Sequence, residues 1–130
     1  MRRISALLLA ACLIFLCGCS VYVDYGSSEL YSRADIDAAV LEVRMAFARM
    51  EGCRLISLQY AGDDTCRKNL GYAQGLAKDR DIRECLVFNS VFLSPLHGGG
   101  AWEPASRYTW TWTLGRSPGG RWILLTYGYA

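Results

Sequence analysis

Histidine and paired cysteine motifs are scarce in this chain of 130 residues, and the scarcity excludes several kinds of site. The one histidine, His97, is followed by three glycines, and no Cys-x-x-Cys pair occurs, so the usual zinc sites are excluded and we expect neither metal nor cofactor. Positive charge is not in excess either, because 14 Lys and Arg face 12 Asp and Glu, and two of the arginines, Arg2 and Arg3, stand at the very start. A chain with so little basic surplus is not expected to bind nucleic acid.

The first residues have the anatomy of an export signal. Arg2 and Arg3 precede an apolar run from Ile4 to Leu16, which is shorter than the ~20 apolar residues of a membrane-spanning helix. The run ends in Leu16-Cys17-Gly18-Cys19, which has the spacing of a lipobox. We therefore expect residues 1–18 to be a lipoprotein signal peptide and Cys19 to carry a lipid such as palmitate. This places the protein on the extracytoplasmic face of the cell membrane.

Two alternatives to lipidation at Cys19 stay open. Leu9-Ala10-Ala11-Cys12 also has lipobox spacing, but cleavage there leaves an apolar region of only about five residues, against the ~7–15 of export signals. The other alternative is an ordinary secretory signal that happens to contain cysteines.

Three cysteines remain behind the leader, namely Cys53, Cys66 and Cys85. Outside the cytoplasm this number permits one disulfide and one free thiol, and the sequence does not choose the pair.

A tether and one domain are expected after the leader. Residues 19–30 show no sustained period and are interpreted as the tether. Ser32 and Asp35 have capping-box spacing, and a helix is expected from there to Gly52, the glycine that ends it. Apolar residues at steps of three and four give it one core-facing side: Ile36, Val40, Val43, Phe47 and Met50.

The remaining patterns predict strands at residues 53–60, 84–93, 107–114 and 121–129, and a weaker helix at 66–78. Gly62-Asp63-Asp64-Thr65 is interpreted as a turn that also caps the weaker helix. Short turns between the last strands imply antiparallel pairing. Residues 31–130 are therefore expected to form a single α+β domain, with a long N-terminal helix packed on a curved, mostly antiparallel four-stranded sheet.

Aromatic motifs in the C-terminal half resemble a family of small lipoprotein domains of unknown function from Gram-positive bacteria. The motifs are Cys85-Leu86-Val87-Phe88, the run from Tyr108 to Arg116, Gly120-Arg121-Trp122 and Tyr127-Gly128-Tyr129. That family is similar in element order to NTF2-like and cystatin-like folds, in which a helix lies in the concave face of a curved sheet. The resemblance implies a cone-shaped cavity, used for small apolar ligands by some members and for catalysis by a few. No catalytic pair of residues maps onto this chain.

The candidate binding residues are aromatic, with one histidine: Trp110, Trp112, Trp122, Tyr127 and His97. In the competing interpretation, most of these aromatics form the contact between helix and sheet. Trp122 and Tyr127 differ in parity along one predicted strand, so they are not expected on the same face.

The sequence favours a non-enzymatic, membrane-anchored module that binds a small apolar ligand or an envelope protein. The rival is a small NTF2-like isomerase or dehydratase, which requires His97 or Glu103 to point into a cavity. No residue is assigned a catalytic role.

Overall fold

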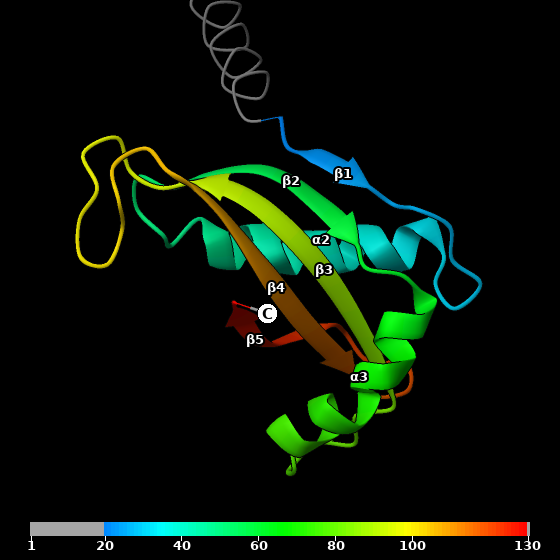
Figure 1. Ribbon diagram of the computed structural model, residues 1–130. Coiled ribbons are helices and arrows are strands. Elements are labelled where there is room, and N and C mark those ends of the chain that lie inside the picture. The colour runs from blue at the N-terminus through cyan, green and yellow to red at the C-terminus, as the bar shows by residue number, and fades with distance from the viewer. Residues whose placement is uncertain (1–19, 130) are drawn as a thin grey trace, which may run out of the picture.

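The computed structural model describes residues 20–129, so the predictions for residues 1–18 and for Cys19 lie outside the described residues. Figure 1 shows the elements, whose bounds in chain order are β1 Tyr22–Asp24, α2 Arg33–Phe47, β2 Arg54–Tyr60, α3 Asp63–Leu76, β3 Glu84–Leu93, β4 Arg107–Arg116 and β5 Ile123–Gly128. Neither helix in this part of the chain is long and apolar enough to cross a membrane.

The strands form a single sheet in the order β1-β2-β3-β4-β5. β1 pairs with β2 in parallel, with Val23 opposite Leu58, and the other neighbours are antiparallel. Parallel neighbours need a long crossover connection, and α2 supplies it between β1 and β2.

The expected fold is therefore wrong. The sheet is mixed and has five strands, and it carries two short helices, whereas we expected one long N-terminal helix on a mostly antiparallel four-stranded sheet. The additional strand, β1, lies within residues 19–30, which were expected to be a tether. Its three residues are too few to show alternation, so it forms because β2 offers a pairing edge. α2 ends at Phe47, and the chain turns before Gly52, which has a φ of 76°.

The start of α2 and its buried side are as predicted. The Ser32 hydroxyl accepts a hydrogen bond from the Asp35 amide, and the Asp35 carboxylate accepts one from the Ser32 amide, each at 3.1 Å. Ile36, Val40, Val43 and Phe47 are buried, and Met50 is half-buried beyond the helix end. Local chemistry and periodicity were thus sufficient to place the start and the buried side of this helix, but its end, at Phe47, was predicted too late in the chain.

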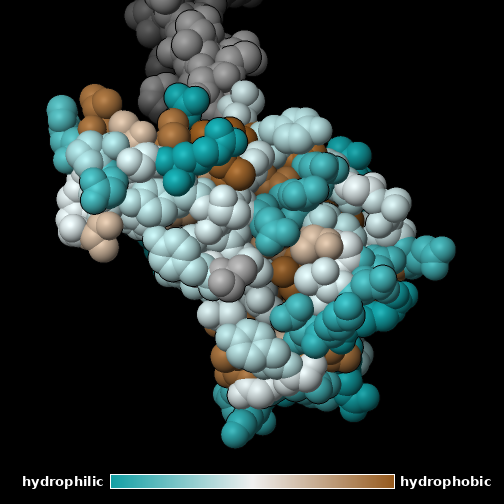
Figure 2. All heavy atoms as spheres, viewed as in Figure 1, coloured by the Kyte–Doolittle hydropathy of each residue, from teal (hydrophilic) through white to brown (hydrophobic). Residues whose placement is uncertain are grey.

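The two helices lie on different faces of the sheet. The strands cross in front of α2 in Figure 1, and α3 packs on β3 and β4 at one end of the sheet. Phe47 of α2 contacts Phe92 and Trp112, which share one face of the sheet. Figure 2 shows the other face, where hydrophobic residues form only small separate patches.

Candidate functional site

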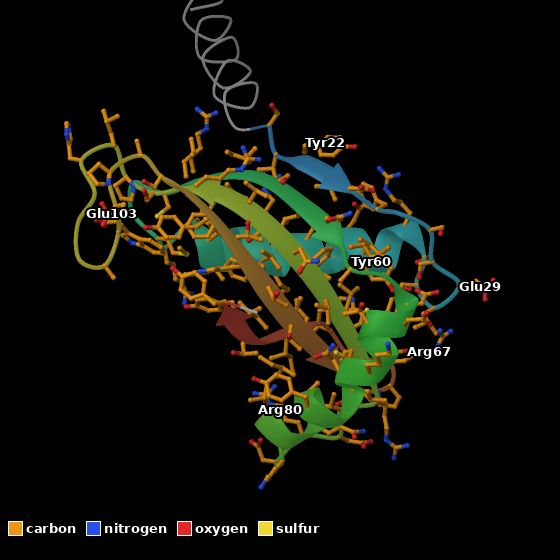
Figure 3. The ribbon with its side chains drawn as sticks, in the orientation of Figure 1. Tyr22, Glu29, Tyr60, Arg67, Arg80 and Glu103 are labelled. Carbon is orange, nitrogen blue, oxygen red and sulfur yellow. The ribbon has the colours of Figure 1, made fainter. Side chains whose placement is uncertain are left out.

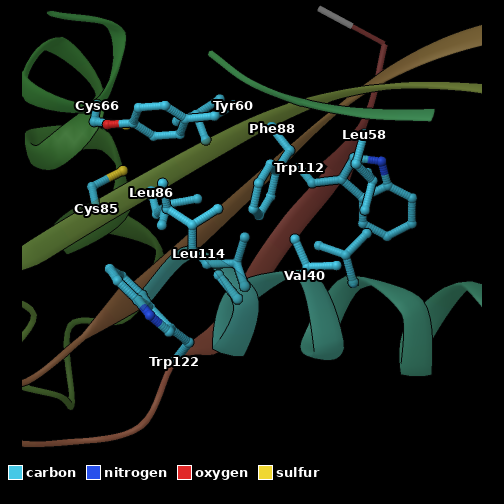
Figure 4. Close-up of a cluster of buried hydrophobic side chains, with 14 of the residues drawn as sticks. Val40, Leu58, Tyr60, Cys66, Cys85, Leu86, Phe88, Trp112, Leu114 and Trp122 are labelled. Atoms are coloured by element: carbon cyan, nitrogen blue, oxygen red, sulfur yellow. The ribbon is translucent and has the colours of Figure 1, made fainter. Parts of the chain in front are cut away.

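The space between α2 and the sheet is filled by the protein's own side chains. Phe88, Phe92, Trp112 and Leu114 are fully buried there, and Figure 4 shows several of these side chains between the strands and the helix. The cone-shaped cavity implied by the resemblance to NTF2-like and cystatin-like folds is therefore not found at this place.

Two of the candidate tryptophans are core residues. The indole Nε1 of Trp112 donates to the Ser90 hydroxyl at 2.8 Å, and Trp112 is fully buried. The indole Nε1 of Trp122 donates to the Asp35 carbonyl at 3.0 Å, which ties the residue before β5 to the first turn of α2.

Trp110 and Tyr127 belong to an aromatic cluster that reaches the surface. The Trp110 ring lies 5.0 Å from the Phe92 ring and 5.6 Å from the Tyr127 ring, measured between centroids. Tyr127 stacks on Trp112 at 4.8 Å while half of its own surface stays exposed. The cluster therefore runs from the core to solvent at the β5 edge.

A β-bulge places Trp122 and Tyr127 on the same face, contrary to the parity argument. Thr113 pairs with Thr126 but the next residue, Leu114, pairs with Leu124, so Leu125 is an extra residue in β5. One extra residue reverses the alternation, and both aromatics then face the side covered by α2.

His97 and Glu103 lie on the loop between β3 and β4, and both are exposed. Figure 3 shows Glu103 on this loop, where it projects beyond the end of the sheet. The loop is closed at its base, where the Ser94 amide donates to the Ser106 carbonyl at 2.9 Å. Neither side chain is held in a cavity, so the geometry required for acid–base chemistry is missing.

A large open groove lies between α2 and the edge strand β5, with a volume of about 780 Å³. We call it the α2–β5 groove. Its lining comes from the last part of α2, the turns after α2 and α3, and β5 with the residues before it: Glu42, Met45, Ala46, Arg49, Met50, Arg80, Arg121, Trp122, Ile123, Leu124 and Tyr127. Two predicted binding residues, Trp122 and Tyr127, are among them.

Arg116 holds the Trp122 end of the groove in place. Its guanidinium lies 4.3 Å from the centre of the Trp122 ring and 3.0 Å from the Asp35 carboxylate, and it also pairs with Glu84. Partial burial raises the pKa of Asp35, but hydrogen bonds from Arg116 and Ser32 outweigh it, so the net pKa of this carboxyl lies below its usual range. Asp35 therefore stays ionised and keeps both α2 and Arg116 in position.

A second hollow, of about 420 Å³, lies on the other face between α3 and the sheet. Its described lining contains threonines, tyrosines and two asparagines, without a charged side chain. It shares only Tyr127 with the α2–β5 groove and contains no tryptophan.

The cysteines do not form a disulfide in the described part of the chain. Cys53 is half-buried, Cys66 and Cys85 are buried, and all three are free thiols. Burial, and next the neighbouring Cys66, raise the pKa of the Cys85 thiol to about 12, so it stays protonated near neutral pH. No group of three or more His, Cys, Asp or Glu side chains within residues 20–129 is arranged to hold a metal ion.

Sequence reasoning missed most of the groove. Met45, Arg49 and Met50 follow one another around the end of α2, but Arg80 and Arg121 are far from them in sequence. The one available signal was Met45, an apolar residue that does not belong to the predicted buried side of the helix.

No family model, curated protein or solved structure matches this chain.

Proposed function

We propose that this protein is a non-enzymatic binding module, held on the extracytoplasmic face of the cell membrane by a lipid on Cys19, and that the α2–β5 groove is its ligand site. The observation that supports this choice of ligand site is the size and the lining of the groove. Its volume of about 780 Å³ falls within the ~300–1,000 Å³ that is typical of small-molecule pockets. Met45, Met50 and Leu124 give the groove an apolar floor. The resemblance to small Gram-positive lipoprotein domains stays a prediction.

The positions of His97 and Glu103 support binding over catalysis. The rival isomerase or dehydratase needs one of them in a cavity, and both are exposed on the loop after β3. Among the described residues that line the α2–β5 groove, the one carboxylate is Glu42, and it is already engaged by Arg121 at 3.2 Å.

Anchoring is tested in the cell. Replacing Cys19 by Ala is expected to release the protein from the membrane fraction, because the lipid attachment point is lost. Cys12→Ala is the matched control, since it removes the competing lipobox cysteine and should leave the protein on the membrane. Retention of the Cys19→Ala protein contradicts the anchoring proposal.

Ligand binding is tested with N-phenyl-1-naphthylamine, an uncharged apolar probe whose fluorescence rises on binding. The protein without residues 1–19 keeps every residue that the structure describes and is the form to titrate. Met45→Gln, in the groove, is expected to weaken probe binding. Leu41→Gln lies one turn earlier on the same exposed side of α2, outside the groove lining, and should bind like the parent. Absence of saturable binding, or equal loss in both variants, rejects the groove as the site.

A further inference from the structure

The α2–β5 groove combines an apolar floor with an excess of positive charge. Three arginines, Arg49, Arg80 and Arg121, line it together with a single carboxylate, Glu42. The protein as a whole has 14 Lys and Arg against 12 Asp and Glu, so this excess is a local feature. An anionic ligand is therefore favoured at this place.

Two of the arginines are available to a ligand. Arg121 is paired with Glu42 at 3.2 Å, whereas Arg49 and Arg80 make no ion pair with any residue of the described range 20–129. Both are exposed, and Arg80, labelled in Figure 3, comes from the turn after α3. A guanidinium presents its N–H groups as a planar fork that fits a carboxylate or a phosphate.

The floor suits a flexible chain. Met45 is nearly half exposed and Met50 is half-buried. Both line the groove, together with Leu124 and the aromatic residues Trp122 and Tyr127. Methionine side chains are unbranched and polarisable, so they adapt to apolar ligands of variable shape.

We propose that the α2–β5 groove binds a single-chain anionic amphiphile, with its hydrocarbon chain against Met45, Met50 and Leu124 and its carboxylate or phosphate head on Arg49 and Arg80. This rests on the groove being the ligand site of the proposed function, and it names the ligand class.

The β-bulge in β5 argues against an acidic peptide as the occupant. β5 is an edge strand, and one common way for an extended peptide to bind beside it is to continue the sheet by pairing with its free edge. The extra residue Leu125 interrupts the regular spacing of the backbone groups along that edge and twists it. The groove is thus better matched to a ligand that does not need a regular strand.

The test compares two ligands that differ only in the head. Dodecanoate and dodecanol, each below its aggregation concentration, compete with N-phenyl-1-naphthylamine for the protein without residues 1–19. Dodecanoate is expected to compete about fivefold more strongly at low salt, because two exposed ion pairs are added, and to lose most of this advantage in high salt. Dodecyl phosphate should behave like dodecanoate.

Variants assign the effect to the groove. The double variant Arg49→Gln/Arg80→Gln is expected to bind dodecanoate and dodecanol equally, and the comparison is made between the two ligands on the same variant. Arg67→Gln/Arg107→Gln removes the same charge from exposed positions outside the groove and should keep the preference for dodecanoate. A parallel loss in the control pair overturns the proposal, because net charge alone then explains the preference.

The outcomes separate this inference from the proposed function. Equal competition by dodecanoate and dodecanol in the parent protein overturns the anionic ligand but leaves an apolar groove site. Failure of the probe itself to bind overturns the proposed function. Competition by an acidic hexapeptide without an alkyl chain overturns the amphiphile in favour of a peptide. Binding to phosphatidylglycerol vesicles without binding of dodecanoate shows that the arginines contact a membrane surface, and it also overturns the proposal.

Discussion

Trp110 and Trp112 lie two residues apart on β4, but their indole N–H groups differ in environment. The Nε1 of Trp112 donates to the Ser90 hydroxyl at 2.8 Å. The Nε1 of Trp110 is buried without a hydrogen-bond partner among the described residues. A buried donor without a partner costs free energy, whereas a satisfied one contributes to stability.

Replacing each tryptophan by phenylalanine should therefore have different effects. Trp112→Phe loses a hydrogen bond and leaves a cavity in a fully buried site, so it is expected to lower the free energy of unfolding by about 2–4 kcal/mol. Trp110→Phe removes the unpartnered donor from a half-buried site and is expected to cost less than about 1 kcal/mol. Urea unfolding followed by far-UV circular dichroism measures both, and equal losses would contradict this account.

Asp63 connects the N-terminal segment to α3. Its carboxylate accepts hydrogen bonds from the Ser28 hydroxyl at 2.6 Å, the Tyr60 hydroxyl at 2.6 Å and the Glu29 amide at 2.8 Å. The Ser28 bond, followed by the Tyr60 bond, lowers the pKa of Asp63 to about 2. Gly62, the residue expected in the capping turn, has no side chain to cap α3.

The stability of the protein should therefore depend on Asp63 in acid. The folded-state pKa lies below the unfolded value of ~3.9, so the unfolded chain binds the proton more readily. The stabilisation is complete above pH ~4 and is lost as the pH falls towards about 2. Urea midpoints between pH 5 and 2 should fall less steeply for Asp63→Asn than for the parent. Asp64→Asn, next to it but paired only with exposed Arg67, is the control and should keep the parental slope.

At the scale of the elements, the stability of α2 depends on the capping box formed by Ser32 and Asp35 and on the ion pair between Asp35 and Arg116. Ser32→Ala removes one half of the box and is expected to cost about 1 kcal/mol. Asp35→Ala should cost more, because the Asp35 carboxylate also binds Arg116 at 3.0 Å. Ser27→Ala, in the exposed segment before the helix, is the control and should change little. Chemical denaturation of the three variants checks this order, and a Ser32→Ala loss no larger than that of Ser27→Ala would rule out the capping role.

The sequence predicted those elements whose signal is local. The strand at residues 84–93 was confirmed with its bounds, and α2 begins where its cap predicted. β1 was missed because it consists of three residues that become a strand only by pairing with β2. The side on which Trp122 and Tyr127 lie was also missed, because the bulge at Leu125 is a feature of the pairing with β4.

For the whole molecule, residues 20–30 are part of the fold. β1 covers one edge of the sheet, Val23 and Tyr25 pack against the core, and Ser28 binds Asp63. A chain that begins at residue 31 is therefore expected to be less stable than one that begins at residue 20, by about 2 kcal/mol or more. Thermal and urea unfolding of the two chains checks this. Equal stabilities would restore the interpretation of this segment as a tether.

A structured segment at this point also constrains the proposed anchor. Only Ser20 and Val21 separate Cys19 from β1, and three extended Cα steps reach at most about 10 Å. If Cys19 carries the lipid, the β1 edge of the sheet stays near the membrane surface. β5 and the α2–β5 groove are then at the opposite edge, because β1 and β5 are the two ends of the strand order.

By itself the sequence determined the features that depend on neighbours along the chain: the cap and buried side of α2, the long strands and the aromatic composition. The lipobox stays a prediction, because Cys19 lies outside the described residues. The number and direction of the strands, the filled interior and the α2–β5 groove were decided only by the tertiary structure. The physical reason is that these features arise where distant segments meet. Arg49, Arg80 and Arg121 come from three separate turns, and Trp122 and Tyr127 share a face only because β5 pairs with β4 through a bulge.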